Sequence, residues 1–121
     1  MTSLDLHGVQ KTITLNGKTY KMDFDMQAFS FAEMVYKTEY GLEADVATVI
    51  SDLFEAKLTP VMAFSYGAIR SAGEAVTWKK FSKEIFTYEN YDEVMSVVVE
   101  AITEMFDSGD KADPSEVDLK N

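Results

Sequence analysis

Side chains that could catalyse a reaction or bind a metal are few and scattered in this sequence. The chain has no cysteine and a single histidine, His7. A Ser-His-Asp triad would have to use His7, and no Gly-x-Ser-x-Gly turn that could expose a nucleophilic serine is present. The six glycines occur singly, which excludes a glycine-rich phosphate loop. We expect His7 to be an ordinary surface residue, neither a metal ligand nor a general base.

Two groups of acidic residues have spacings that could bind a metal or move a proton. The segment that begins at Asp107 resembles a calcium-binding loop, but its third and sixth positions are Gly109 and Ala112, where an EF-hand needs an acid and a glycine. Asp23 and Asp25 could form a carboxylate pair on one strand face. A polar strand face that ends in a helix N-cap explains them better. The sequence therefore predicts no catalytic residue, metal site or cofactor.

The charge of the chain is strongly negative and unevenly distributed. The formal net charge is −10, and residues 84–121 hold 11 acidic and only 2 basic side chains. Nucleic-acid backbones are bound by basic surfaces, and no basic stripe is present here. The longest uncharged run, 58–69, has 12 residues, whereas a membrane-spanning helix needs about 20. Because the N-terminus also lacks a signal-peptide pattern, we expect a cytosolic protein whose partner is neither a nucleic acid nor a membrane.

The elements that hold these side chains begin with a β-hairpin. Residues 12–15 and 18–22 alternate between apolar and polar side chains and flank Asn16-Gly17, the pair that a two-residue type I′ turn prefers. This turn predicts the residue pairs Leu15–Lys18, Ile13–Tyr20 and Lys11–Met22. One face of the hairpin is then apolar. Helices must cover it, since a two-stranded hairpin alone is marginal in water.

Four or five helices are predicted to follow the hairpin. Apolar side chains repeat with helical spacing over 26–37, 43–56, 60–72, 78–86 and from Asn90 to about Phe106. The predicted N-terminal signals are Asp25, Thr59 before Pro60, Thr77, and a capping box of Asn90 with Glu93. The helix over 60–72 is apolar nearly all round, which is typical of a buried central helix, and Gly67 within it indicates a close helix crossing.

The sequence thus predicts an α+β fold that is mostly α. A single domain, 1–106, consists of the hairpin and the helical bundle. Residues 107–121 are polar and aperiodic, and we expect them to form a flexible, disordered acidic tail.

Methionines and aromatic residues are numerous for a chain of this length. Most methionines, including Met34, Met62, Met95 and Met105, have core spacing and are predicted to be buried. Six apolar residues lie off the main core stripes, and we predict that a protein-binding surface includes some of them: Phe31, Tyr40, Tyr88, Tyr91, Val97 and Phe106.

The segment 13–28, which reads ITLNGKTYKMDFDMQA, leads into a predicted helix that contains Glu33 and ends near Gly41. It resembles the opening of the tail assembly chaperones of long-tailed bacteriophages, in which a hairpin with an Asn-Gly turn runs into a Phe-Asp-Met/Ile-x-Ala helix start. The motif covers about residues 13–41, and the rest of the chain is similar to that family in architecture and size.

The resemblance implies a chaperone without catalytic activity. Proteins of that family coat the long tape-measure protein in the host cytoplasm until tail tube subunits polymerise around it. They associate with themselves and are not retained in the virion. The partners that the resemblance implies are the tape-measure protein and further copies of the chain, with the tail tube protein as an additional candidate.

Two other interpretations remain open at this stage. The chain is also compatible with another small phage or prophage morphogenesis protein, such as a head–tail connector or a minor tail component, which would be present in purified virions. The other alternative is an acidic helical adaptor, an enzyme subunit or an acidic mimic of nucleic acid, for which a fixed acidic face is expected.

The last three residues bear on a further property that the resemblance implies. Many genes of that family yield a longer product through a −1 ribosomal frameshift. The sequence closes on Leu119-Lys120-Asn121, which a slippery site of the form A-AAA-AAC or A-AAA-AAT would encode. If the codons have that form, we expect this chain to be the short product.

Overall fold

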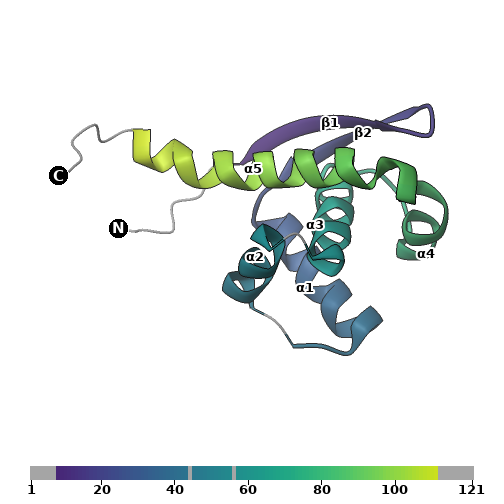
Figure 1. The fold of residues 1–121 in the computed structure, drawn as a ribbon, viewed down its shortest axis with the longest axis horizontal. Helices are drawn as coiled ribbons and strands as arrows, with labels where there is room; N and C mark the ends of the chain where they lie inside the picture. Colours follow the sequence, from purple (N-terminus) through teal and green to yellow (C-terminus); the bar gives the residue numbers. More distant parts are fainter. Residues whose placement is uncertain (1–7, 44, 56, 112–121) are drawn as a thin grey trace.

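The fold is a β-hairpin followed by a helical bundle, which confirms the predicted α+β class (Figure 1). A computed structural model describes residues 8–43, 45–55 and 57–111. The elements are β1 Val9–Leu15, β2 Lys18–Phe24, α1 Met26–Tyr40, α2 Val46–Phe54, α3 Leu58–Ser71, α4 Trp78–Lys80, the π-helix η1 Phe81–Ile85, the 3₁₀-helix η2 Tyr88–Asn90 and α5 Tyr91–Lys111. In these ranges no helix is both long enough and apolar enough to cross a membrane.

Both ends of the chain extend past the described ranges. His7 and residues 112–121 of the predicted tail lie outside them. The backbone of α5 continues to Lys111, past Phe106, where the sequence predicts the tail to begin.

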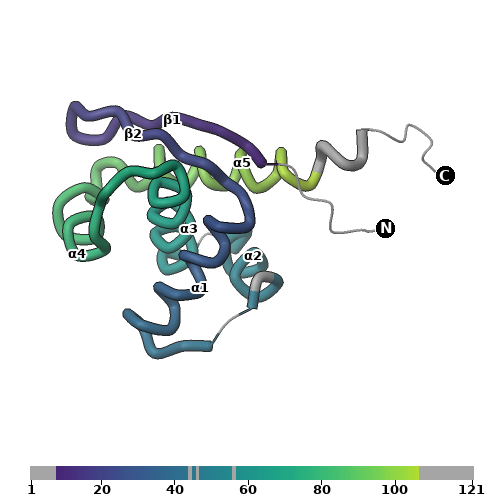
Figure 2. The backbone as a smooth tube through the Cα atoms, turned by 180° about the vertical axis from the view of Figure 1, so that it is seen from behind, coloured from purple at the N-terminus to yellow at the C-terminus, as the bar shows by residue number. Residues whose placement is uncertain are grey.

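The hairpin has the turn and the register that the sequence predicts. Asn16 and Gly17 have φ angles of 55° and 83°, as a type I′ turn requires at both positions. The strands pair Leu15 with Lys18, Ile13 with Tyr20 and Lys11 with Met22. The apolar face is covered by α3, which packs against β2, and by α5, which packs against β1. Figures 1 and 2 show both helices on the same side of the hairpin.

The central helix is α3, whose residues are all buried from Pro60 to Ile69. It packs most extensively against α1. A Cβ atom built on Gly67 would lie 2.5 Å from the carbonyl oxygen of Ala28 and 3.2 Å from the Cβ of Phe31. The predicted close crossing at Gly67 is therefore confirmed. Next to it, the rings of Phe29 and Phe64 meet edge to face at 4.8 Å.

The first helix begins at its predicted N-cap and ends at Gly41, past the predicted boundary. The N–H of Ala28 donates to Oδ1 of Asp25 at 3.0 Å, so Asp25 is the N-cap of α1. Gly41 has a φ angle of 67°, and its N–H donates to the carbonyl oxygen of Lys37. The left-handed conformation that glycine tolerates thus ends α1 three residues later than the predicted boundary at Lys37.

Other helix boundaries correct the prediction. The N-cap of α3 is Lys57, without a side-chain cap bond, so Thr59-Pro60 is not the helix start. Pro60 is the third helical residue, where its missing N–H falls among the first four N–H groups, which have no partner inside a helix anyway. The second helix is also shorter than the predicted 43–56; it begins after Asp45, whose Oδ1 accepts the N–H of Thr48 at 2.8 Å.

The segment between α3 and α5 departs most from the prediction. The expected helix over 78–86 is a single turn, α4, that continues as the π-helix η1, in which the N–H of Phe86 donates to the carbonyl oxygen of Phe81. The predicted capping box of Asn90 with Glu93 is wrong. Asn90 instead accepts the N–H of Thr87 at 2.9 Å, and its amide donates to the carbonyl oxygen of Ile85 at 2.9 Å.

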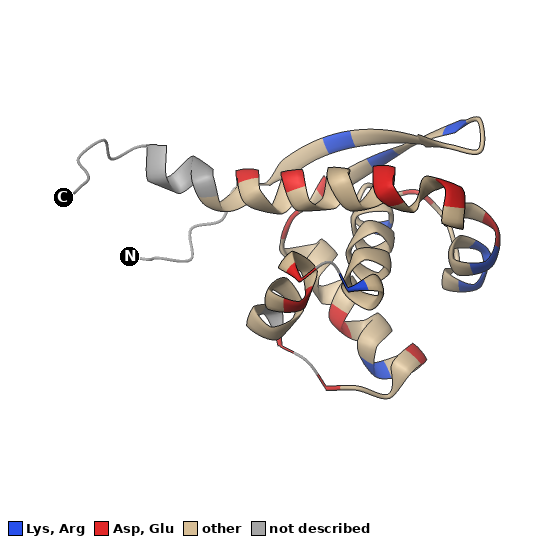
Figure 3. Cartoon of the chain, in the orientation of Figure 1, with Lys and Arg blue, Asp and Glu red and all other residues tan. Residues whose placement is uncertain are grey.

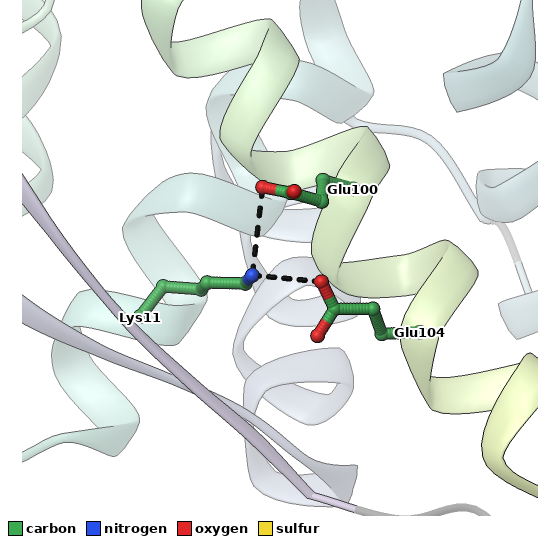
Figure 4. A network of polar contacts seen from close by, with 3 residues as sticks. All are labelled: Lys11, Glu100 and Glu104. Carbon is green, nitrogen blue, oxygen red and sulfur yellow. Dashed lines mark hydrogen bonds and ion pairs between the residues drawn. The ribbon is translucent and has the colours of Figure 1, made fainter.

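An ion pair ties α5 to the hairpin (Figure 4). Nζ of Lys11, on β1, lies 2.8 Å from Oε2 of Glu104 and 3.4 Å from Oε1 of Glu100. The hydrogen bond to Glu104 raises the pKa of Lys11 above its usual value, so its positive charge is held next to two acidic residues of α5.

Candidate protein-binding site

Asp25, one of the two acidic residues that could form a carboxylate pair, has a structural role. Oδ1 of Asp25 accepts the N–H of Ala28 and, at 2.7 Å, the hydroxyl of Ser71, so this carboxylate links the start of α1 to the end of α3. Within the described ranges no three histidine, cysteine, aspartate or glutamate side chains are placed to hold a metal ion. The acidic segment that begins at Asp107 has no described side chains. Two depressions lined mainly by apolar side chains are the candidates for a protein-binding site.

One exposed apolar surface lies between α2 and α5. We call it the α2–α5 groove, an open depression of about 480 Å³ lined by Ile50, Phe54, Thr103 and Phe106. Phe54 is 53% exposed and Phe106 is 38% exposed, although both are large apolar side chains. Figure 1 shows α2 below the C-terminal part of α5. Side chains that remain this exposed in a small protein commonly mark a binding surface when they are contiguous.

The groove is formed by apolar side chains of α2 that lie beside the residues this helix buries. Among the α2 side chains that the structure describes, Val49 and Leu53, one helical turn apart, are buried and enter the core. Ile50 and Phe54 are each one position further round the helix and face the groove. The predicted apolar stripe of this helix is thus divided between the core and the surface.

The helix α5, which forms one side of the groove, is acidic. Residues 84–106 contain six acidic side chains and no basic one, and Figure 3 shows several acidic positions on α5. The two of them nearest to Phe106 in sequence, Glu100 and Glu104, are bound to Lys11 of β1. Next to α2, Lys57 is bound by Asp52 and Glu55, each at 3.3 Å. These carboxylates raise the pKa of Lys57, with the hydrogen bond to Asp52 as the largest cause. An apolar ligand with positive charges beside its apolar face fits this environment.

A second apolar depression lies between α1, α3 and α4. It has a volume of about 280 Å³ and is lined by Phe31, Met34, Val35, Thr38, Glu39, Tyr66, Arg70 and Trp78. The guanidinium of Arg70 lies over the ring of Phe31 at 5.3 Å. It also donates to the hydroxyl of Tyr66 at 2.9 Å and to the carbonyl oxygen of Val76 at 3.3 Å. Because the guanidinium of Arg70 is bound by groups of the fold, the pocket presents mainly apolar side chains to a ligand.

The six residues predicted for binding do not form one surface. Phe31 lines the second pocket, and Tyr40 lies nearby, its ring 6.3 Å from that of Trp78. Phe106 lines the α2–α5 groove. The other three lie elsewhere: Tyr88 is 93% exposed on η2, whereas Tyr91 and Val97 are half-buried and pack against the core.

Three surface residues were not predicted from the sequence. Met34 is 50% exposed, so its predicted burial is wrong, whereas Met62 and Met105 are buried and Met95 is partly buried. The buried side of α1 consists of Ala28, Phe29, Ala32, Val35 and Tyr36, and Met34 lies on the flank. Ile50 and Phe54 have the same helical spacing as core residues, and no local signal separates them from Val49 and Leu53.

Comparison of the chain with known protein families, with curated proteins and with solved structures finds no match.

Proposed function

We propose that this chain is a tail assembly chaperone of a long-tailed bacteriophage or prophage. In this role it binds the tape-measure protein, keeps it soluble in the host cytoplasm during tail morphogenesis and is absent from the mature virion. The structural observation that carries the proposal is the α2–α5 groove, an exposed apolar surface on the acidic helix α5. The sequence motif over 13–28 supplies the resemblance to the family.

The groove suits an amphipathic helix of the partner. Such a helix places large apolar side chains at i, i+3 or i+4 into a groove, and here they would contact Phe54 and Phe106. Burying one large apolar side chain contributes roughly 1.5–3 kcal/mol. Lysine or arginine residues beside these anchors would face the carboxylates of α5. The excess negative charge of the chain, −10, then keeps the complex dispersed in solution.

The proposal is tested by co-expressing the full chain with the tape-measure protein of the same genome. The fraction of soluble tape-measure protein is measured with the wild type and with a Phe54→Ser, Phe106→Ser double variant. We expect the groove variant to lose most of this solubilising effect. A matched control is Met26→Ser, Tyr88→Ser, which removes two exposed apolar side chains that do not line the groove. A groove variant that solubilises as well as this control would contradict the proposal.

A further measurement separates the proposal from the alternative of a virion component. A chaperone is released before the tail is complete, so mass spectrometry of purified virions should not detect the chain. Its presence there in stoichiometric amounts would favour a head–tail connector or a minor tail component. Association with further copies and with the tail tube protein is part of the same proposal and is measured by affinity pull-down with the full chain as bait.

A further inference from the structure

The two edges of the hairpin are bonded differently. The backbone N–H of Lys21, on β2, donates to Oε2 of Glu74 at 3.1 Å, so it points away from β1. Lys21 is paired with Thr12. In an antiparallel pair, two opposed residues direct their backbone groups either both inward or both outward. The N–H and C=O of Thr12 therefore point outward from β1, and so do those of Gln10 and Thr14, two residues away on either side.

No other residue within the described ranges bonds these outward groups of β1. The side chains of Gln10, Thr12 and Thr14 are exposed and uncharged. The strand pairs over all seven residues without a bulge and contains no proline. Proteins usually protect a free strand edge with charges, prolines, bulges or a covering segment. On β2 that protection is visible in Glu74 and in the charged residues Lys18, Lys21 and Asp23. On β1 the one charge is Lys11, on the inner face that α5 packs against, and the outward backbone groups of Gln10, Thr12 and Thr14 have no partner within the described ranges.

We propose that the β1 edge pairs with the β1 edge of a second copy of this chain. The strands run antiparallel about a two-fold axis at Thr12, so that Thr12 faces Thr12 of the other copy and Gln10 faces Thr14. Three residues of each copy then form roughly six interchain hydrogen bonds. The product is a closed dimer with a continuous four-stranded sheet. Growth stops there because the outer strands of that sheet are the two β2 strands, which Glu74 protects.

The chemistry of the edge favours a second copy as its occupant. Self-pairing places only uncharged side chains opposite one another on the outer face, where like charges would be destabilising. Threonine pairs already occur on this face, since the hydroxyls of Thr14 and Thr19 are 2.8 Å apart. The one charge of β1, Lys11, is neutralised by Glu100 and Glu104 of its own chain. The inference assigns a surface to the self-association that the proposed function includes, but it is argued from the β1 edge alone, so a failed solubilisation test would not overturn it.

A cross-linking experiment tests the position of the two-fold axis. The chain has no cysteine, so Thr12→Cys introduces a single thiol. Under mild oxidation we expect it to form an interchain disulfide at least severalfold faster than Thr19→Cys. Thr19 lies on the same outer face and is also exposed, but it belongs to β2. Equal rates of disulfide formation in the two variants would overturn the proposed pairing.

Equilibrium sedimentation tests the same axis without a covalent bond. The wild-type chain is expected to dimerise below about 100 µM, in the range of small, weak interfaces. Thr12→Lys and Thr12→Glu should each weaken the dimer by at least about tenfold, because two like charges meet at the axis. An equimolar mixture of these two variants should dimerise again, and Thr19→Lys should behave as the wild type.

Three results would overturn the proposal. The first is a wild-type chain that stays monomeric throughout this range, and the second is a dimer that Thr12→Lys leaves unchanged. The third is a wild-type chain that is monomeric and binds the extended segment of another protein, together with a Thr12→Lys variant that no longer binds it. This result would assign the β1 edge to that partner. Circular dichroism checks that the Thr12 and Thr19 variants fold. We expect them to, because both side chains are exposed and the N–H of neither residue bonds to the other strand of the hairpin.

Discussion

At the scale of single residues, the ring and the hydroxyl of Tyr36 have opposite effects on stability. Its side chain is buried between α1 and α2, and within the described ranges its hydroxyl has no hydrogen-bond partner. Burial raises the pKa of Tyr36 to about 12, and the nearby carboxylate of Asp52 adds to this effect. A buried hydroxyl without a partner loses its hydration without compensation. The ring contributes to the core, whereas the hydroxyl opposes folding.

Replacing Tyr36 by phenylalanine should therefore leave stability unchanged or raise it by about 1 kcal/mol at neutral pH. The pH dependence gives a second signature. Because the pKa of Tyr36 is higher in the folded than in the unfolded chain, the free energy of unfolding falls as the pH rises from 10.0 towards about 12. The variant should lose less stability over that range. Urea unfolding at several pH values measures both effects, and a loss above 1 kcal/mol at neutral pH would show that the hydroxyl is bonded.

Gly67 is a second residue at which a single added atom, the Cβ of alanine, is expected to change the stability of the fold. Alanine is the better helix former by about 1 kcal/mol, but its Cβ would lie 2.5 Å from the carbonyl oxygen of Ala28. Because this oxygen belongs to the backbone of α1, the two helices must separate. We expect Gly67→Ala to destabilise the fold by roughly 1–3 kcal/mol in chemical denaturation. Gly8→Ala, where the nearest atoms are 4.0 Å away, is the control and should be nearly neutral.

At the scale of elements, the hairpin turn is attached to the segment that follows α4. The side-chain amide of Asn16 donates to the carbonyl oxygens of Glu84 and Ile85, at 3.1 and 3.2 Å. These are the last residues of the π-helix η1, where carbonyl groups lack partners within the helix. Asn16 thus has two functions: it adopts the positive φ angle of the turn, and it connects the turn to η1.

Two substitutions separate these functions of Asn16. Asn16→Gly keeps the turn conformation and removes only the two hydrogen bonds, so it should lower the free energy of unfolding by about 1–2 kcal/mol. Asn16→Asp also tolerates the turn, but it places a carboxylate against two carbonyl oxygens and should cost more than glycine. Thermal or urea unfolding measures both changes. Equal stability of the two variants and the wild type would mean that the turn is not held by η1.

The elements also show which features the sequence predicts and why. The hairpin register, the cap at Asp25 and the stop at Gly41 depend on residues a few positions apart, and these predictions are confirmed. The capping box at Asn90 failed because the amide of Asn90 bonds to Ile85 in an irregular turn. The π-helix and the attachment of Asn16 involve residues far apart in the chain, which no local pattern encodes.

The candidate site was predicted only in part for the same reason. Phe31, Tyr40 and Phe106 lie off the core stripes of their helices and are at or near the two apolar depressions. Phe54 lies within the apolar stripe of α2. Whether such a residue is buried depends on which side of α2 is covered by neighbouring helices, and this is a property of the tertiary fold.

At the scale of the whole molecule, the net charge of −10 acts on both proposed associations, with opposite signs. Two copies that pair through β1 repel each other, whereas a partner helix with lysine or arginine beside its apolar face is attracted. At physiological ionic strength the screening length is about 8 Å, so charges around an interface are still felt. Added salt weakens both effects. The salt dependence of the binding constants should therefore distinguish association between copies from binding of the partner.

We expect the two associations to respond to salt in opposite directions. Between about 0.05 and 0.5 M NaCl, binding of a basic amphipathic helix to the α2–α5 groove should weaken severalfold, mainly through slower association. Dimerisation through β1 should strengthen or remain constant. Fluorescence titration with a partner peptide and sedimentation of the chain alone measure the two constants. The control peptide carries glutamine in place of each lysine and arginine, and its weaker binding should hardly depend on salt. If the basic peptide also showed no dependence, the groove would bind through apolar contact alone, and the acidic surface of α5 would have no part in choosing the partner.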